Sequence, residues 1–424
     1  MRQWTIFASA AFLTCVTCGA VELAEFPKLG EAQPRALDVT ALQAWYGDTL
    51  ILKNDAQSAT DVQRAEALIT NLLRTTEASR QQILKQQILA LKLSPAVLRA
   101  VVRHGQVPAL LEARKGAFSV SIAIPGFKDK SVNAALLVPD GYTTEKLWPV
   151  ILSLHGAHGN GADYLKHWRH DSAADRIKDY IIVAPTAAEG YGWGPATFGR
   201  AQISAALDFV NAHYRTDPER LYLEGTSMGG VGAKRLAAFW PDRFAALVTR
   251  SGPSIPPQQA SALRNLHALP WLSLAGAQDK LIAEKYFIAE KNLATKEQLP
   301  ATLDIFPDRG HESFQDKDAD ALAYFAANAR RRAPDKLRFV SFEDGSGGQR
   351  HYFVEIAATD TLADLQSDEI VLNNSKTDDP LLKQLQTAAT LTQYEALLKQ
   401  AKEKGLVLES KKVDGYPVVA GRLY

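Results

Sequence analysis

The chain has 424 residues, of which 46% are hydrophobic and 22% charged, and its formal net charge is +1 at pH 7. The composition is that of an ordinary globular protein, and the length is sufficient for two or three domains. Acidic and basic residues are interspersed. The basic surplus that a nucleic-acid partner would require is missing, so we expect no such partner.

The first twenty residues differ from the rest of the chain. Arg2 carries a positive charge, an apolar run extends from Trp4 to Val16, and small side chains follow it. This pattern predicts a secretory signal peptide over residues 1–20, cleaved after Ala20. The mature protein is then secreted or periplasmic.

Two other interpretations of this segment remain open. An uncleaved membrane anchor is disfavoured because the run is shorter than the roughly 20 apolar residues that span a bilayer. A lipoprotein with Cys18 as the lipidated residue fits less well, because Cys15-Val16-Thr17 matches that pattern poorly. Both cysteines lie within the segment, so we expect no disulfide, thiolate nucleophile or thiolate metal ligand in the mature chain.

Residues 21–115 are predicted to form a helical N-terminal region. Apolar residues recur there at helical spacing: Ala65, Leu68, Ile69, Leu72 and Leu73. Ser94 followed by Pro95 is typical of a helix start, with serine as the N-cap and proline in the first helical position. We find no catalytic constellation in this region and expect an accessory layer or a small domain.

Residues 116–332 alternate between segments with strand character and segments with helical character. The expected strands cover 118–124, 132–138, 149–154, 181–184, 221–224, 245–248, 271–274 and 301–306, and the expected helices include 203–213 and 231–239. Strands that alternate with helices predict an α/β domain with a mainly parallel sheet covered on both faces.

Residues 333–424 are predicted to form a small α+β appendage. Two apolar segments, 337–342 and 351–356, flank a glycine-rich stretch and predict a hairpin. Thr392 and Glu395 form a capping-box signal for a helix that runs to Gly405. A terminal hairpin is expected between 406–408 and 417–420.

One motif carries the chemistry. The apolar segment 221–224 leads into Gly225-Thr226-Ser227-Met228-Gly229, and a helix follows. A sharp strand-to-helix turn lifts the serine hydroxyl clear of the backbone, and it tolerates little side chain on either side. Ser227 is therefore the predicted nucleophile.

A serine hydroxyl is a weak nucleophile unless a base lies within reach. His311 follows the last predicted strand, and histidine titrates in the range required of the base. Asp279, at the end of another apolar strand, is the acid expected to orient it. Asp308 is the rival acid, but it lies too near His311 in sequence to approach the ring from behind.

An oxyanion formed at the substrate carbonyl requires two donors. The first is expected to be the backbone N–H of Met228, directly after the serine, at the N-terminus of the helix. The second is expected to be the backbone N–H of Ala157, in the loop after the strand that ends at Leu154. His155 and Gly156 then shape that loop.

The stretch from Gly116 to Arg330 resembles a known group of enzymes. The His155-Gly156 pair, the Tyr-Gly-Trp-Gly run from Tyr191 to Gly194 and the segment TDPERLYLEGTSMGGVGAKRLAAFWPDRFAALVTRSG carry the resemblance. They are similar to the esterase branch of the α/β-hydrolase superfamily, which includes feruloyl and acetylxylan esterases, polyhydroxybutyrate depolymerases and prolyl-oligopeptidase-type relatives. The resemblance implies the α/β-hydrolase fold and the chain order serine, acid, histidine. Thr226 departs from the usual His-Ser-Met motif.

Several further residues have both a structural and a functional interpretation. Tyr191 and Trp193 are candidates for the substrate pocket, and simple loop packing is the alternative. The histidines at 155, 158, 167 and 170 lack the spacing of a metal site, so we expect no metal and no cofactor. We expect Glu224 to face a loop, with a contact to the catalytic residues as the alternative, and Lys234 to lie on a solvated helix face.

Three hypotheses for function follow. The favoured one is a serine hydrolase that cleaves carboxylic esters, either small molecules or polysaccharide-linked esters, through Ser227, His311 and Asp279. The second keeps the same residues but cleaves peptides; the lack of a propeller-like region argues against the large oligopeptidase form. The third is a non-catalytic binding protein on a hydrolase scaffold.

Overall fold

The computed structural model describes residues 56–104 except 76, 114–187 except 145 and 170–173, residue 193, and residues 196–254 and 261–331, together with short segments before 56 and after 331. The predicted signal peptide and Tyr191 lie outside the described residues. Within the described part of the chain, no helix is both long enough and apolar enough to cross a membrane.

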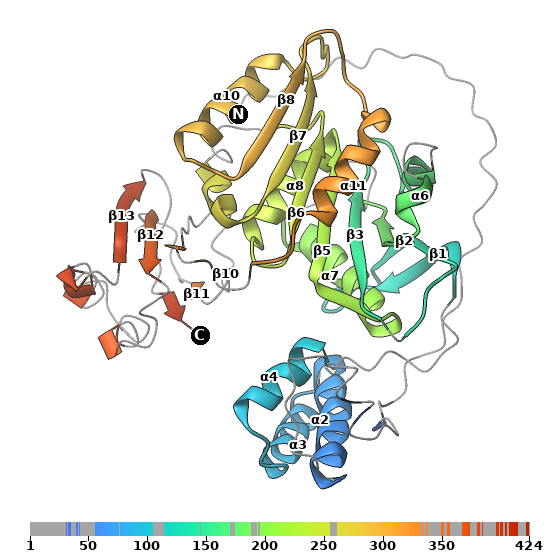
Figure 1. Cartoon of the computed structure of the whole chain (residues 1–424), viewed down its shortest axis with the longest axis vertical. Helices are drawn as coiled ribbons and strands as arrows, with labels where there is room; N and C mark the ends of the chain where they lie inside the picture. The colour runs from blue at the N-terminus through green and yellow to red at the C-terminus, as the bar shows by residue number, and fades with distance from the viewer. Residues whose placement is uncertain are drawn as a thin grey trace.

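The centre of the molecule is an eight-stranded sheet (Figure 1). Its strands are β1 (Gly116–Ala123), β2 (Ser131–Val138), β3 (Trp148–Leu154), β4 (Ile181–Pro185), β5 (Thr216–Thr226), β6 (Ala246–Arg250), β7 (Trp271–Gly276) and β8 (Ala301–Phe306). They are ordered β1-β2-β4-β3-β5-β6-β7-β8. β1 pairs with β2 and β2 with β4 in antiparallel fashion, and the other pairs are parallel. The α/β architecture predicted from the alternating pattern is confirmed.

Helices cover both faces of this sheet. The described ones are α5 (Gly161–Leu165), α6 (Ala174–Ile177), α7 (Ala196–His213), α8 (Met228–Phe239), α10 (Glu284–Lys296) and α11 (Asp318–Ala326), with short 3₁₀ turns η2 (Lys166–Arg169), η4 (Ser261–Ala268) and η5 (Gln315–Lys317). Strand β3 is buried along its whole length. Such a strand reads as a continuous apolar run, which is why the sequence pattern located it.

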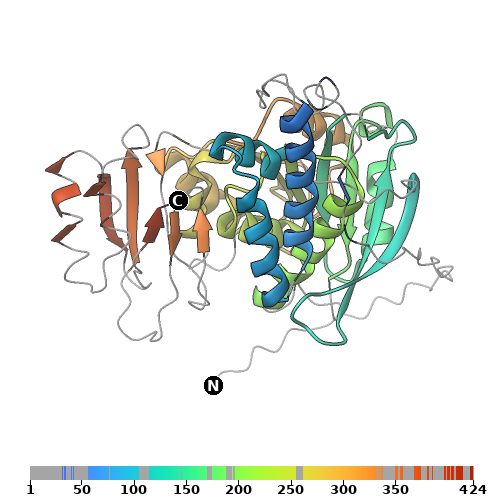
Figure 2. The ribbon, with the colours of Figure 1, turned by 90° about the horizontal axis from the view of Figure 1, so that it is seen from below.

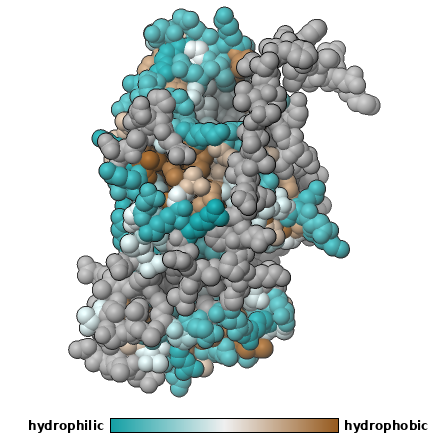
Figure 3. Space-filling model, turned by 90° about the vertical axis from the view of Figure 1, so that its right-hand side faces the viewer, coloured by the Kyte–Doolittle hydropathy of each residue, from teal (hydrophilic) through white to brown (hydrophobic). Residues whose placement is uncertain are grey.

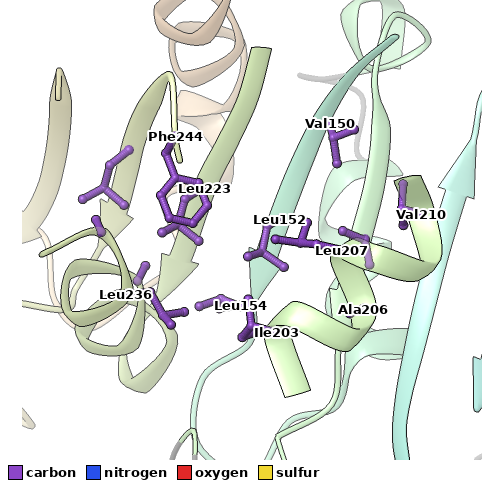
Figure 4. Close-up of a cluster of buried hydrophobic side chains, with 14 of the residues drawn as sticks. Val150, Leu152, Leu154, Ile203, Ala206, Leu207, Val210, Leu223, Leu236 and Phe244 are labelled. Carbon is purple, nitrogen blue, oxygen red and sulfur yellow. The ribbon is translucent and has the colours of Figure 1, made fainter. Parts of the chain in front are cut away.

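Successive side chains of a strand point to opposite faces, so the sheet has two cores. On one face Val150, Leu152 and Leu154 pack against α7 and α8, where Ile203, Leu207 and Leu236 are among the contacts (Figure 4). On the other face, Ile151 and its neighbours pack against η2, α6 and α11. These two layers fix the strand ends from which the site is built.

Three helices precede the sheet: α2 (Ala56–Arg74), α3 (Ala78–Ala90) and α4 (Pro95–His104). They form a small core of their own around Val62, Ala65 and Val101. Ser94 accepts a hydrogen bond from the Val97 backbone N–H at 3.3 Å, as expected for an N-cap. The three helices lie together beside the sheet domain in Figures 1 and 2.

The described residues after 331 form two three-stranded sheets. Their strands are β9 (Lys336–Leu337), β10 (Gln349–His351), β11 (Val354–Ile356), β12 (Ser367–Asn373), β13 (Val407–Val413) and β14 (Gly421–Leu423), in the orders β10-β11-β14 and β13-β12-β9.

The first predicted hairpin in this region is wrong, and residues 417–420 of the second lie outside the described residues. β9 pairs with β12 rather than with β11, and β13 pairs with β12 rather than with the terminal strand, β14, which joins β11. Residues 351–356 do not form one strand: β10 and β11, which are neighbours in sequence, pair with each other, and β14 takes the other side of β11. For the predicted helix from Thr392 to Gly405, the described residues between 396 and 403 are helical, and the capping residues lie outside the described part.

Large apolar side chains are also found at the surface. Among the described residues, Leu73, Leu89 and Leu281 are the most exposed of them. On the face drawn in Figure 3, hydrophilic side chains surround a central cluster of hydrophobic ones. Scattered exposed apolar residues are normal for a globular protein.

Candidate active site

Ser227 lies at a sharp turn between β5 and α8. Its backbone has φ 57° and ψ −120°, a conformation that residues other than glycine rarely adopt. Such strain costs on the order of 1–3 kcal/mol and persists only where surrounding structure enforces it. Here the Ser227 N–H donates to the Arg250 carbonyl at 2.7 Å, and the Ser227 carbonyl accepts from the Val231 N–H at 3.0 Å.

The glycines on either side of Ser227 are required by close backbone contacts. A Cβ on Gly225 would overlap the backbone of Gly229, and a Cβ on Gly229 would overlap the carbonyl of Leu154 at the end of β3. Neither contact involves a flexible side chain that could move away. The motif therefore brings α8 directly against the end of β3, beside the predicted oxyanion loop.

The three predicted side chains meet at the ends of β5, β7 and β8. The Nε2 atom of His311 is 2.8 Å from the Ser227 Oγ, and its Nδ1 atom is 2.7 Å from the Asp279 Oδ2. The Asp279 side chain is fully buried, whereas the His311 ring is 19% exposed. The ring thus lies between a buried carboxylate and a serine hydroxyl, with one edge open to the solvent side.

The second oxygen of Asp279 is held by the backbone. Oδ1 accepts hydrogen bonds from the N–H groups of Leu281 and Ile282, each at 2.8 Å. These bonds fix the rotation of the carboxylate, so that Oδ2 is the oxygen directed at His311.

The histidine loop is tied to the strand next to the nucleophile. The Ser251 hydroxyl donates to the Glu312 carbonyl at 2.9 Å and accepts from the Glu312 N–H at 3.2 Å. Ser251 follows Arg250, whose carbonyl binds the Ser227 N–H. The backbone beside His311 and the backbone of Ser227 are therefore held by adjacent residues of one strand end.

His155 shapes the loop that carries Ala157. Its Nδ1 atom lies 2.6 Å from the Gly156 carbonyl, and its Nε2 atom accepts from the Ala187 N–H at 3.0 Å. The ring therefore carries its proton on Nδ1 and is neutral. Burial lowers the pKa of His155, and the hydrogen bond to Gly156 only partly opposes this effect.

The two predicted oxyanion donors belong to α8 and to the loop after β3. Met228 is the first residue of α8. Ala157 is exposed and follows Gly156, where an added Cβ would lie 3.5 Å from the Ser227 Cβ. Met228 is thus next to the serine in sequence, and the loop of Ala157 approaches the serine at Gly156.

Trp193 packs beside the same loop. Its ring lies 4.9 Å from the His155 ring, measured between centroids, and an added Cβ on Gly232 of α8 would come within 2.6 Å of its Cδ1 atom. The indole is partly buried. Much of its surface is therefore used in packing, which was the alternative interpretation for this residue.

Asp308 and His167 lie outside the hydrogen-bonded set of Asp279, His311 and Ser227. Asp308 is exposed, and both ring nitrogens of His311 already have partners. His167 pairs with Asp318 at 2.9 Å, and His170 lies outside the described residues. Among the described residues, no group of three or more His, Cys, Asp or Glu side chains is arranged to hold a metal ion.

Two predictions about charged residues are wrong. Glu224 does not face a loop: it is fully buried, and its Oε2 accepts from the Arg250 Nη1 at 2.6 Å. Lys234 is not solvated: it is 1% exposed and pairs with the equally buried Glu290. Sequence reasoning missed Arg250, Glu290 and Asp318. For Arg250 the available signal was a charged residue within an apolar strand, since a buried charge requires a partner.

The fold, with a serine turn between β5 and α8, defines the chain as an α/β-hydrolase. A family model described as "Putative esterase" matches residues 128–341, half of the chain, and the chain belongs to this esterase family.

Similar proteins are mostly esterases by name. The chain is 33% identical over 141 residues to "Putative esterase NocK" of Nocardia uniformis subsp. tsuyamanensis, covering 31% of this chain and 40% of that protein. It is 29% identical over 136 residues to feruloyl esterase B of Neurospora crassa, covering 30% of this chain and 46% of that protein. The chain thus spans less than half the length of these relatives. An S-formylglutathione hydrolase structure from Staphylococcus aureus has a TM-score of 0.42 and 16% identity, covering 51% of this chain and 99% of that one.

Proposed function

We propose that this protein is a secreted serine hydrolase that cleaves carboxylic esters through an acyl-enzyme intermediate. The observation that carries the proposal is the continuous hydrogen-bonded chain from Asp279 through His311 to Ser227, at 2.7 and 2.8 Å, with the serine on a strained turn. A nucleophile, a base and an orienting acid within hydrogen-bond reach are what acyl transfer by serine requires.

In the proposed reaction Ser227 Oγ attacks the ester carbonyl carbon, and its proton passes to His311 Nε2. The Asp279 carboxylate keeps the other ring proton on Nδ1 and stabilises the imidazolium. The tetrahedral intermediate collapses when His311 returns the proton to the leaving alcohol, which departs and leaves an ester on Ser227. Water then attacks this acyl-enzyme with the same proton transfers, releasing the acid and restoring the serine.

The proposed oxyanion hole uses the backbone N–H groups of Met228 and Ala157. The N-terminus of α8 adds a partial positive charge where the oxyanion would form. Fixed donors of this kind are worth about 3 kcal/mol each to the transition state, because no reorganisation accompanies the reaction.

The proposed substrate is a small-molecule or polysaccharide-linked ester. Support comes from the names of relatives, among them feruloyl esterases. A pocket role for Trp193 is kept as a proposal because its ring packs on His155, next to the loop of Ala157. The same role for Tyr191 rests on the sequence alone.

We also propose the domain boundaries that the sequence indicates: a signal peptide at 1–20, a helical region at 21–115, the catalytic domain at 116–332 and an appendage at 333–424. The separate cores of the helices and of the sheet support the second boundary. Mass spectrometry of the secreted chain tests the first: an N-terminus at Val21 is expected, and one at Met1 or a lipidated Cys18 would contradict it.

Turnover of p-nitrophenyl acetate by wild type and by Ser227→Ala tests the catalytic proposal. We expect the variant to be inactive, and Ser131→Ala, which alters an exposed serine of β2, to retain wild-type activity. A panel of peptide substrates run in parallel distinguishes ester from peptide cleavage. Full activity in Ser227→Ala would exclude the proposed nucleophile, and a folded wild type without hydrolytic activity would favour the non-catalytic scaffold.

A further inference from the structure

A group of charged side chains is buried beneath the serine turn. Arg250 at the end of β6 donates through Nη1 to Glu224 of β5 at 2.6 Å, and through Nη2 to Asp318 of α11 at 2.8 Å. All three side chains are fully shielded from solvent. The Arg250 guanidinium therefore links the neighbouring strands β5 and β6 to the helix α11.

Further bonds extend this group to the other side of the site. The Tyr164 hydroxyl, from α5, donates to the Glu224 Oε2 at 3.1 Å and lies 2.7 Å from the Thr226 Oγ1. His167 contacts the Asp318 Oδ1 through Nε2 at 2.9 Å. Both α5 and η2 follow the loop of Ala157.

The members of the group lie close in the chain to each proposed catalytic element. Glu224 lies three residues before Ser227 in the chain. The Arg250 carbonyl accepts a hydrogen bond from the Ser227 N–H. Asp318 begins the helix that follows the histidine loop. The Arg250 guanidinium thus bonds to side chains near the proposed nucleophile and base. Through Glu224 and Asp318 it is also linked to α5 and η2, which follow the loop of the proposed oxyanion donor.

Stability alone does not explain such a group. Two charges that are removed from water lose their hydration, and their mutual attraction offsets this loss only in part. Well-packed apolar residues commonly stabilise a core as well as a buried ion pair does, or better. Two of its buried polar atoms, Arg250 Nε and Asp318 Oδ2, have no hydrogen-bond partner among the described residues. The arrangement is costly in folding free energy, but it supplies directional hydrogen bonds that an apolar core would lack.

We infer that Arg250, held between Glu224 and Asp318, is a positioning residue that sets the distance and orientation between Ser227 and His311. The inference rests on the proposed serine-hydrolase function. Arginine suits the role because its planar fork binds two carboxylates in fixed directions, whereas lysine offers a single flexible ammonium. Misplacement of reacting groups by about 1 Å can cost roughly 10²-fold in rate.

The test compares Arg250→Lys and Tyr164→Phe with a matched control, Arg264→Lys. Arg264 pairs with Glu297 at 3.1 Å, and both precede the starts of β7 and β8, at the edge of the sheet opposite the site. For each folded variant kcat and KM for p-nitrophenyl acetate are measured, with the rate of labelling by a fluorophosphonate and the thermal unfolding midpoint.

We expect Arg250→Lys to lower kcat and the labelling rate about 10²-fold, with KM within about threefold of wild type. Tyr164→Phe removes one hydroxyl and should lower kcat about tenfold, because Thr226 and Glu224 lose their link. Arg264→Lys should alter neither parameter. A positioning role predicts this kcat effect; a purely structural role predicts a lower unfolding midpoint with unchanged kcat.

Folded Arg250→Lys with the kcat of the Arg264→Lys control would overturn the inference. If Arg250→Lys does not fold, Tyr164→Phe decides: a loss of kcat at constant KM supports the inference, and an unchanged kcat overturns it. Failure of the proposed function is a separate result. In that case the wild type itself is not labelled by the fluorophosphonate, or Ser227→Ala is labelled at the same rate.

Discussion

Replacement of Asp279 by asparagine tests the orientation of the proposed base. The two backbone donors, Leu281 and Ile282, both point at Oδ1. In Asp279→Asn the amide oxygen must take that position, so the amide NH₂ faces His311. An NH₂ group donates, so His311 Nδ1 must become an acceptor and the ring proton moves to Nε2. His311 then presents an N–H to Ser227 and can no longer accept its proton.

The expected loss in kcat is about 10⁴-fold, the size that this exchange produces in a well-studied serine protease, equivalent to roughly 5 kcal/mol in the barrier. Asparagine keeps the volume and both backbone hydrogen bonds, so the unfolding midpoint should change little. The assay is p-nitrophenyl acetate hydrolysis at neutral pH, with thermal unfolding followed in the same preparations. A folded Asp279→Asn variant whose kcat is within tenfold of wild type would refute the reasoning.

Three further changes have defined outcomes. Gly229→Ala forces a Cβ into the Leu154 carbonyl and should cost about 3 kcal/mol in urea unfolding, whereas Gly141→Ala, with open space around it, should change stability by no more than about 0.5 kcal/mol. Burial lowers the pKa of His155 below 6.5, so the stability of the wild type should fall as the pH drops through this value. His155→Gln should remove part of that fall, and an identical dependence of stability on pH in the two proteins would contradict a lowered pKa for His155. Arg309 lowers the pKa values of Glu312 and Asp316 below 4.5 and 3.8. Wild type should therefore exceed Arg309→Gln in unfolding midpoint at neutral pH, and this advantage should vanish as the pH falls below those values.

The sheet was predictable because its central strands are buried on both faces. A parallel strand covered by helices must be apolar throughout, and β3, β4 and β7 read that way. The first half of β5 was missed, since it contains a proline and charged residues between Thr216 and Arg220. The pairing of β9 with β12 and of β11 with β14 was not predicted, because it depends on contacts between distant segments, which local turn signals do not encode.

The side chains proposed for catalysis could be chosen from local motifs and chain order. Each follows a strand, and the carboxyl ends of parallel strands meet at one edge of the sheet, so Ser227, Asp279 and His311 were expected to lie together. The group around Arg250 was not predictable in this way. Its members come from two strands, two helices and a 3₁₀ turn. Only the three-dimensional structure brings Glu224 and Asp318 to the Arg250 guanidinium and Tyr164 to Glu224.

Covalent labelling of the serine tests the central proposal most directly. The full chain is treated with a fluorophosphonate, and the adduct is located by peptide mass spectrometry. We expect one adduct per chain, on Ser227, and no labelling of Ser227→Ala. A folded wild-type protein that takes no label, or a label on another residue that persists in Ser227→Ala, would contradict the proposed nucleophile.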